Sequence, residues 1–352
     1  MRFGQIFALV LSLMFITGLA NPVHAATSSR TTKSTEKAVK AKPSSKKVTA
    51  SKAVSKKTTV KSRAVAPAKS ASPKKVVSRV EQQFDKDGNP LLRSAAFMVQ
   101  ELDSGRVLLE KNADSSLPIA SISKLMTAMV VLDAHLDLNE QMQVSEEDVD
   151  RLKNTSSHLP VGTVLSRDDM LRLALMASEN RAASALSRYY PGGHGAFIVA
   201  MNEKARVLGL KETRFEDSIG LNKNNVSSAR DLAVIVANAA RYPLIREFTT
   251  TAEHTVSLNG RPRVFHNTNA LVRQTNNDWQ IGLSKTGFIN ESGRCLVMQA
   301  WFSNKPVAIV LLDSNGSYTR IGDANRIRKW VETALSAQSH VATLSMNGGA
   351  SN

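Results

Sequence analysis

The sequence predicts an α/β domain of the α+β type, in which one antiparallel five-stranded sheet is flanked by helices. Two observations predict this fold class. Strand-like segments stand at both ends of the folded region, and helix-like segments fill the stretch between them. The expected strands of the sheet cover 94–102, 106–110, 279–283, 294–302 and 306–313. Because the helical stretch interrupts these strands, we expect it to form an inserted helical subdomain beside the sheet.

Turn residues separate the expected strands. Residues 103–105 (Asp-Ser-Gly) join the first two strands, and residues 303–305 (Ser-Asn-Lys) join the last two. The dipeptide Asn259-Gly260 is a further hairpin signal between short strand-like runs at 255–258 and 264–266.

The helices are predicted by apolar spacing and by capping residues. Residues 121–135 present a wide apolar face that includes Leu125 and Met129. Ser166 and Ser228 each stand three residues before an aspartate, which is typical of a capped helix start. The expected helices cover 121–135, 166–176, 181–189, 195–208, 229–241 and 323–335.

The charge of the chain is unevenly distributed. The 352 residues carry a net charge of +16, but residues 27–80 alone hold sixteen Lys and Arg against one acid. Residues 81–352 contain equal numbers of bases and acids. We therefore expect a basic, disordered linker at 26–90, a folded domain at 91–338 and a flexible C-terminal tail at 339–352.

Residues 1–25 have the features of a secretory signal peptide. Arg2 precedes an apolar run at 6–19, and small residues before and at Ala25 suggest cleavage after that residue. A retained membrane anchor is the alternative, although the run is short for a membrane span. We expect export to the periplasm and no transmembrane anchor after cleavage.

The basic segment 27–80 has two interpretations. It is either a solvated tether or an attachment to an anionic envelope surface. Nucleic acid, the usual partner of such a segment, is excluded here by the expected export. Cys295 is the one cysteine, so the chain forms no intramolecular disulfide, and its apolar surroundings indicate an unreactive core thiol.

Ser121 and Lys124 are the first candidate reactive pair. They are three residues apart at the start of a helix, a spacing that puts two side chains on one face. A lysine can accept the serine proton only if its pKa falls by about three units, which requires burial and a nearby cation. The plain alternative is that Ser121 caps the helix.

Two further polar motifs follow. Ser178 and Asn180 stand at a helix break, where ordinary turn chemistry is the alternative explanation. Residues 285–287 (Lys-Thr-Gly) follow a strand-like run and suit the binding of a substrate carboxylate, although an ordinary strand end has the same composition.

Together these motifs are specific. Ser-x-x-Lys, Ser-x-Asn and Lys-Thr-Gly, in this order, resemble the serine nucleophile set of penicillin-binding proteins and class A β-lactamases. Within that superfamily the sequence is most similar to the D-alanyl-D-alanine endopeptidases, low-molecular-mass penicillin-binding proteins of the Gram-negative periplasm. The resemblance covers 94–335 and implies a β-lactamase/transpeptidase-like fold.

The resemblance also implies roles for the serine residues and the general base. Ser121 would attack the carbonyl of a D-alanine, with Lys124 as general base. Ser178 would relay a proton to the leaving amine, and Asn180 would hold the substrate amide. Water would then hydrolyse the acyl-enzyme.

The third motif would bind the substrate. Lys285 would keep the pocket positive and, with Thr286, would bind a carboxylate. Gly287 would let the substrate backbone approach closely. The backbone N–H groups of Ser121 and Phe288 would form the oxyanion hole.

Three sequence features of related protein families are missing here, and their absence distinguishes between the possible relatives. The related carboxypeptidases carry a further β domain and an amphipathic anchor helix, whereas residues 336–352 are polar. The deacylating Glu-x-x-Leu-Asn motif of β-lactamases is missing, because Ser218 stands where its glutamate would be. A penicillin adduct should therefore persist. No zinc signature occurs, and we expect no metal and no cofactor.

We therefore expect a periplasmic serine D,D-endopeptidase that acts on cross-linked peptidoglycan and is inhibited covalently by β-lactams. Two alternatives stay open at this point. One is a D-alanyl-D-alanine carboxypeptidase. The other is a non-catalytic protein that binds peptidoglycan as a scaffold.

Overall fold

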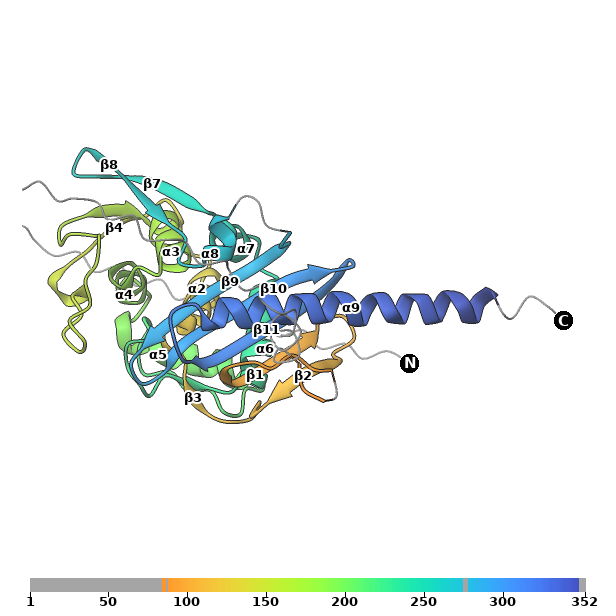
Figure 1. The fold of residues 1–352 in the computed structure, drawn as a ribbon. Helices are drawn as coiled ribbons and strands as arrows, with labels where there is room; N and C mark the ends of the chain where they lie inside the picture. The colour runs from red at the N-terminus through yellow and green to blue at the C-terminus, as the bar shows by residue number, and fades with distance from the viewer. Residues whose placement is uncertain (1–83, 87, 275–277, 348–352) are drawn as a thin grey trace, which may run out of the picture. The chain divides into compact units, whose positions relative to one another are not determined.

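The fold is built around a five-stranded antiparallel sheet with the order β2-β1-β11-β10-β9 (Figure 1). The computed structural model describes residues 84–86, 88–274 and 278–347. The signal peptide and almost all of the basic linker expected from the sequence lie outside these residues. The sheet strands are β1 (Ser94–Glu101), β2 (Val107–Lys111), β9 (Ile281–Ile289), β10 (Gly293–Phe302) and β11 (Lys305–Ser314). Strands from both ends of the domain thus form one sheet, as predicted.

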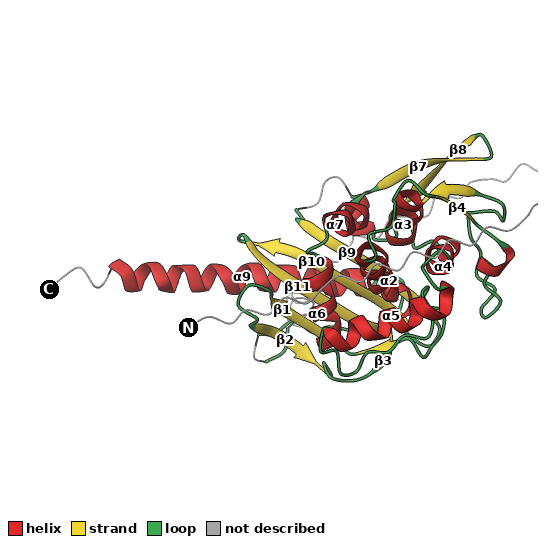
Figure 2. Ribbon diagram, turned by 180° about the vertical axis from the view of Figure 1, so that it is seen from behind, coloured by secondary structure: helices red, strands yellow, loops and turns green. Residues whose placement is uncertain are grey.

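Helices cover the two faces of the sheet unequally. Alternate residues of β1 point to opposite faces, so Ala96 and Met98 join one hydrophobic cluster while Phe97 and Val99 join another. The first cluster packs against the helical subdomain and the second against the final helix (Figures 1 and 2). The helices are α2 (Lys124–Asp133), α3 (Arg167–Met176), α4 (Asn180–Arg188), α5 (Gly193–Val207), α6 (Ala229–Ala239), α7 (Pro243–Thr250), α8 (Ala270–Arg273) and α9 (Thr319–Asn347).

Short elements complete the helical side. The 3₁₀ helices are η1 (Ala120–Ser123) and η2 (Glu146–Asp148), and paired strands are β3 (Leu117–Pro118) with β6 (Val226–Ser227), β4 (Gln141–Gln143) with β5 (Val164–Ser166), and β7 (Glu253–Leu258) with β8 (Arg261–His266). Ser166 and Ser228 cap α3 and α6, as predicted, by accepting a hydrogen bond from the backbone N–H three residues later. Asn259 and Gly260 form the turn between β7 and β8.

The structure differs from the sequence expectations at four places. The expected helix at 121 begins as the 3₁₀ helix η1 and becomes α-helical only at Lys124. Strand β9 does not end at 283 but continues to 289, through the Lys-Thr-Gly motif. Helix α7 was not predicted, because a run of three threonines obscures its apolar spacing. Residues 339–347, expected to be a flexible tail, are the end of α9.

Helix α2 lies at the centre of the helical side (Figure 2). Eight of its ten residues are buried, including the charged residue Lys124. Burying an ammonium group is unfavourable unless it is paired or neutral, so this lysine needs an explanation beyond packing.

Candidate active site

Ser121 lies in η1, in a turn whose backbone conformation is fixed by its neighbours. The preceding residue, Ala120, has a positive φ of 49°, which is uncommon for a residue with a side chain. A Cβ atom on Gly220 would lie 2.0 Å from the Ala120 carbonyl oxygen, so only glycine fits at that contact. The N-cap residues of η1 and α2 are Ile119 and Ser123. Ser121 therefore caps neither helix, and its hydroxyl is turned to other partners.

Lys124 is the main partner of Ser121. Its Nζ donates hydrogen bonds to Ser121 Oγ at 2.9 Å, to Asn180 Oδ1 at 2.9 Å and to the Ile219 carbonyl oxygen at 2.6 Å. The side chain is almost completely buried, and burial lowers the pKa of Lys124 to about 7, while the charges of Asp217 and Glu179 oppose the shift. A large fraction of this amine is therefore neutral at neutral pH.

The Ile219 carbonyl is aimed by a loop that sequence reasoning missed. The Asp217 carboxylate accepts hydrogen bonds from the backbone N–H groups of residues 219–222, including that of Ile219 at 2.9 Å and that of Asn222 at 2.6 Å. Asn225 ties the same loop to Ser123 through an Nδ2–Oγ hydrogen bond of 3.0 Å. In the sequence, Asp217 stands four residues before the pair Leu221-Asn222. Nothing in the sequence indicates that the Ile219 carbonyl contacts Lys124, because every residue has a backbone carbonyl whatever its side chain.

The second motif stands at the start of α4. Ser178 has a positive φ of 59°, and Asn180 Nδ2 donates to Thr155 Oγ1 at 3.0 Å. The buried Glu179 carboxylate accepts from Ser157 Oγ at 2.6 Å and from the His158 backbone N–H at 3.0 Å. The middle residue of this motif therefore holds the loop that supports Asn180.

The third motif is on β9, an edge strand of the sheet. Lys285 Nζ donates to Ser178 Oγ at 2.8 Å, and Thr286 Oγ1 donates to Thr268 Oγ1 at 2.7 Å. A Cβ on Gly287 would lie 2.8 Å from the Ile119 carbonyl oxygen, so the glycine lets β9 contact η1. Phe288 follows at the surface with half of its side chain exposed.

Lys285 is the second buried lysine of the motif residues, and its pKa is lowered too. Burial lowers the pKa of Lys285 well below its ordinary value, and the charges of Lys124 and Arg320 lower it further.

Arg320, in the first turn of α9, was missed by sequence reasoning. Its Nη1 donates to the carbonyl oxygens of Gly287 at 3.2 Å and Cys295 at 3.3 Å. Burial raises the pKa of the Cys295 thiol to about 11, which agrees with an unreactive core residue.

One ion pair joins the two sides of this site. Lys153 belongs to the loop that carries Thr155, and Glu291 belongs to the turn after β9. Their Nζ and Oε1 atoms are 2.5 Å apart, although the residues are 138 positions apart in sequence. The loop beside Asn180 and the turn beyond Phe288 are thereby connected.

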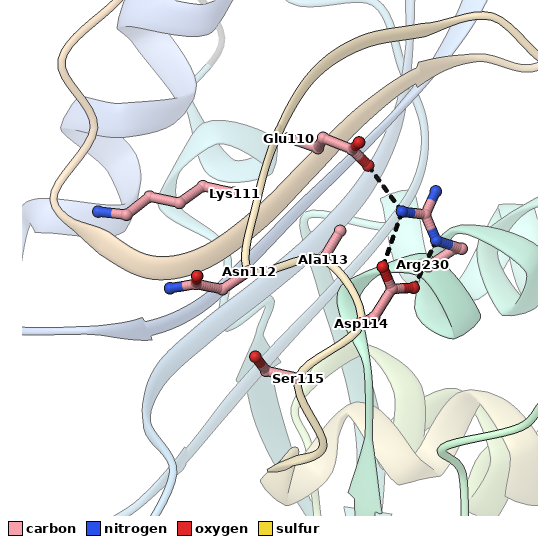
Figure 3. A pocket seen from close by; sticks show the side chains of 7 residues that line it. All are labelled: Glu110, Lys111, Asn112, Ala113, Asp114, Ser115 and Arg230. Carbon is pink, nitrogen blue, oxygen red and sulfur yellow. Dashed lines mark hydrogen bonds and ion pairs between the residues drawn. The ribbon is translucent and has the colours of Figure 1, made fainter.

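A separate hollow of about 470 Å³ lies between the end of β2 and the start of α6 (Figure 3). Arg230 projects into it and contacts Glu110 at 2.8 Å and Asp114 at 2.6 Å. Arg230 and the two carboxylates of this hollow thus already pair with one another. None of the motif residues lines it, so it is not the centre of the chemistry described above.

Comparisons with known proteins agree with this geometry. The model of the D-alanyl-D-alanine carboxypeptidase family, peptidase S11, matches residues 83–316. The chain belongs to this family. A D-alanyl-D-alanine endopeptidase of Escherichia coli K12 is 47% identical over 246 residues, which cover 69% of this chain and 79% of that protein. An endopeptidase of the same name from Pseudomonas aeruginosa PAO1 is 45% identical over 278 residues, covering 77% of this chain and 86% of that protein.

Solved structures of family relatives show the same fold. The Streptomyces K15 DD-transpeptidase superposes with a TM-score of 0.64 at 28% identity, covering 69% of this chain and 98% of that one. Penicillin-binding protein D2 of Listeria monocytogenes, solved in an ampicillin-bound form, gives a TM-score of 0.59 at 28% identity and the same coverage. The β-lactamase/transpeptidase-like fold expected from the motifs is confirmed, and the chain is a serine D-alanyl-D-alanine peptidase by family.

Proposed function

We propose that this protein is a periplasmic serine D,D-endopeptidase that hydrolyses the D-alanyl–diaminopimelate cross-links of peptidoglycan through an acyl-enzyme at Ser121. The observation that carries the proposal is the position of Lys124 Nζ, 2.9 Å from Ser121 Oγ and 2.9 Å from Asn180 Oδ1, together with its lowered pKa of about 7. When Lys124 is neutral, its two N–H groups can donate to Asn180 Oδ1 and the Ile219 carbonyl oxygen. Its lone pair can then accept the hydroxyl proton of Ser121. A serine paired with such an amine is an activated nucleophile.

The reaction follows from the partners of each group. Neutral Lys124 takes the Ser121 proton as Oγ attacks the carbonyl of D-alanine, and the backbone N–H groups of Ser121 and Phe288 hold the developing oxyanion. The proton that Lys124 has taken then passes to the leaving amine through the hydroxyl of Ser178, which gives its own proton to the amine and is reprotonated by Lys124. Lys285 Nζ donates a hydrogen bond to Ser178 Oγ. Lys285 and Thr286 bind the carboxylate of the leaving residue, and Asn180 binds the substrate amide. Water then releases the acyl group.

The names of the more similar relatives favour cleavage of cross-links over release of terminal D-alanine. The relatives named endopeptidases from E. coli and P. aeruginosa are 45–47% identical, whereas a carboxypeptidase of Bacillus subtilis is 30% identical. Purified protein should convert cross-linked muropeptide dimers to monomers, and Ser121→Ala should not. Release of D-alanine from pentapeptide monomers without loss of dimers would instead identify a carboxypeptidase.

β-Lactams should acylate Ser121 and remain bound. Ser218, at the position where β-lactamases carry the deacylating glutamate, is buried and donates to the Ala183 carbonyl oxygen at 3.3 Å and to Ser187 Oγ at 3.1 Å. It offers no carboxylate to activate water. A penicillin adduct that survives for hours fits this proposal, and rapid release of penicilloate would contradict it.

The location and the basic segment belong to the same proposal. In the part of the chain that the structure describes, no helix has both the length and the apolar character needed to cross a membrane. We propose cleavage after Ala25, and attachment of residues 27–80 to an anionic envelope surface. Deletion of 27–80, or high salt, should then release the protein from envelope fractions. Association that resists both would refute the attachment.

A further inference from the structure

A hollow of about 500 Å³ lies at the end of the sheet, beside Phe288. It is formed where β1 and β10 begin and where β9 and β11 end. The residues that line it are Arg93, Ala95, Phe288, Asn290, Gly293, Arg294, Asp313, Ser314, Asn315 and Gly316. It is separate from the Arg230 hollow, because the two share no lining residue.

The strand register connects this hollow to the proposed carboxylate site. In β9, Thr286 and Phe288 are two residues apart, so both side chains are on the same face of the sheet, about 7 Å apart along the strand. Thr286 pairs with Leu296, which packs in the cluster under α9, and Phe288 pairs with Arg294. Lys285 is on the opposite face. A ligand that extends past Thr286 along the α9 face therefore reaches Phe288 and Arg294 next.

The chemistry of the hollow suits an anion on a flat apolar support. The Arg294 guanidinium lies over the exposed Phe288 ring, with Cζ 4.6 Å from the ring centroid. Among the residues that the structure describes, this guanidinium has one hydrogen-bond acceptor, at a long distance of 3.5 Å from Nη2 to Ser317 Oγ. Its other N–H groups can therefore donate to a carboxylate, which arginine binds with two hydrogen bonds. The exposed Arg93 adds a second positive charge, and Asp313 adds a negative one.

A neighbouring cation strengthens the preference for an anion. The charge of Arg294 contributes to lowering the pKa of Arg320, whose Nη1 is bound to the Gly287 carbonyl oxygen. Arg320 and Arg294 are thus two neighbouring positive charges near the end of β9, and Arg93 lines the same hollow as Arg294 from the start of β1. A carboxylate bound by Arg294 would reduce the repulsion between the guanidinium groups of Arg294 and Arg320.

We propose that this hollow binds the leaving peptide stem of a cross-linked substrate, and that Arg294 binds a carboxylate of that stem. The inference rests on the proposed endopeptidase function. When a carboxypeptidase acts, the leaving group is a single D-alanine, which ends at Thr286. When a cross-link is cut, the leaving group is an entire anionic peptide, which must continue beyond Thr286. Arg294 is thereby a specificity-determining residue for cross-linked substrates.

The test compares KM and kcat of full-length wild type and Arg294→Gln on three substrates. These are a cross-linked disaccharide-tetrapeptide dimer, the same dimer with all acceptor-stem carboxylates amidated except that of the leaving residue, and a pentapeptide monomer. Arg294→Gln should raise KM for the dimer about tenfold, with little change in kcat. KM for the amidated dimer and for the monomer should not change. Arg93→Gln should show a smaller increase of the same kind, and Arg206→Gln, an exposed arginine on α5, should show none.

Two outcomes would overturn the inference. One is an unchanged KM for the dimer in Arg294→Gln. The other is an equal increase for the charged and the amidated dimer, which would indicate lost packing on Phe288 rather than lost charge recognition. Failure of the proposed function is distinguishable, because the wild type itself would then leave the dimer intact. Penicillin acylation of Ser121 should proceed at wild-type rate in Arg294→Gln, which verifies that the variant is folded.

Discussion

At the scale of single residues, the chemistry of the site depends on the ionisation of one buried amine. Lys124 has three hydrogen-bond acceptors around its Nζ, and its pKa is lowered to about 7 mainly because burial removes it from water. Asp217 and Glu179 limit that shift. The result is an amine that is partly neutral near pH 7, which is the condition for the proton transfer that we propose for Lys124.

Acylation of Ser121 should therefore depend on pH in a defined direction. Lys124 accepts a proton only when neutral, so the second-order rate of acylation by benzylpenicillin should rise about tenfold per pH unit below pH 7 and level off above it. Stopped-flow or quench measurements between pH 5 and 9 provide the profile. A rate that is flat over this range, or one that continues to rise beyond pH 9, would show that Lys124 is not the base.

Glu179 should influence the same profile in two separable ways. Its charge raises the pKa of Lys124, and its oxygens hold Ser157 and His158. Glu179→Gln removes the charge but keeps an oxygen that can accept from the His158 N–H and an amide that can donate to Ser157 Oγ. The midpoint of the pH profile should therefore move to lower pH with the plateau nearly kept. Glu179→Ala also frees the loop beside Asn180, so its plateau should fall about tenfold or more. Identical plateaus in the two variants would contradict the positioning role.

At the scale of elements, Ser121 is positioned where three segments meet. The 3₁₀ helix η1 carries it, the loop around Gly220 contacts η1 from one side, and β9 contacts it at Gly287. Both contacts use glycine, because the backbones approach more closely than a Cβ would allow. Small displacements at such contacts can reduce reaction rates strongly.

Gly220→Ala tests this positioning. Its Cβ would meet the Ala120 carbonyl oxygen at 2.0 Å, so η1 must move and acylation should fall about a hundredfold. Gly209→Ala is a matched control, because Gly209 has a similar positive φ of 72° but open space around its Cβ position. The control should lose about 1–2 kcal/mol of stability and keep its acylation rate. Equal acylation rates in the two variants would show that the contact does not position Ser121.

The elements differ in how far the sequence predicts them. The sheet strands and capped helices follow from apolar alternation and from Ser-x-x-Asp starts. The end of β9 was misjudged because Lys285 and Thr286 interrupt the apolar pattern, although both side chains are buried and bonded across the cleft. The extension of α9 to Asn347 was missed because residues 336–347 are mostly polar or small in sequence, so the apolar spacing of a helix is weak there.

At the scale of the whole molecule, the motif residues could be predicted from the sequence, but the residues that hold them in place could not. Ser121, Lys124, Ser178 and Lys285 stand in recognisable spacings, and the structure brings them within hydrogen-bond distance of one another in pairs. Arg320, 33 residues beyond Gly287, and Ile219, which acts through its backbone, carry no local signal. Their contacts with Gly287 and Lys124 join residues that are far apart in the sequence, and these contacts form only in the folded domain.

The most direct test of this arrangement is the mass of the protein after incubation with benzylpenicillin, followed by peptide mapping. Wild type should gain the mass of one penicilloyl group, located on the peptide that contains Ser121, and Ser121→Ala should gain none. Lys124→Met should be folded yet acylate at least a hundredfold more slowly. A stable adduct on another residue, or acylation that survives in Ser121→Ala, would contradict the assignment of Ser121 as the nucleophile.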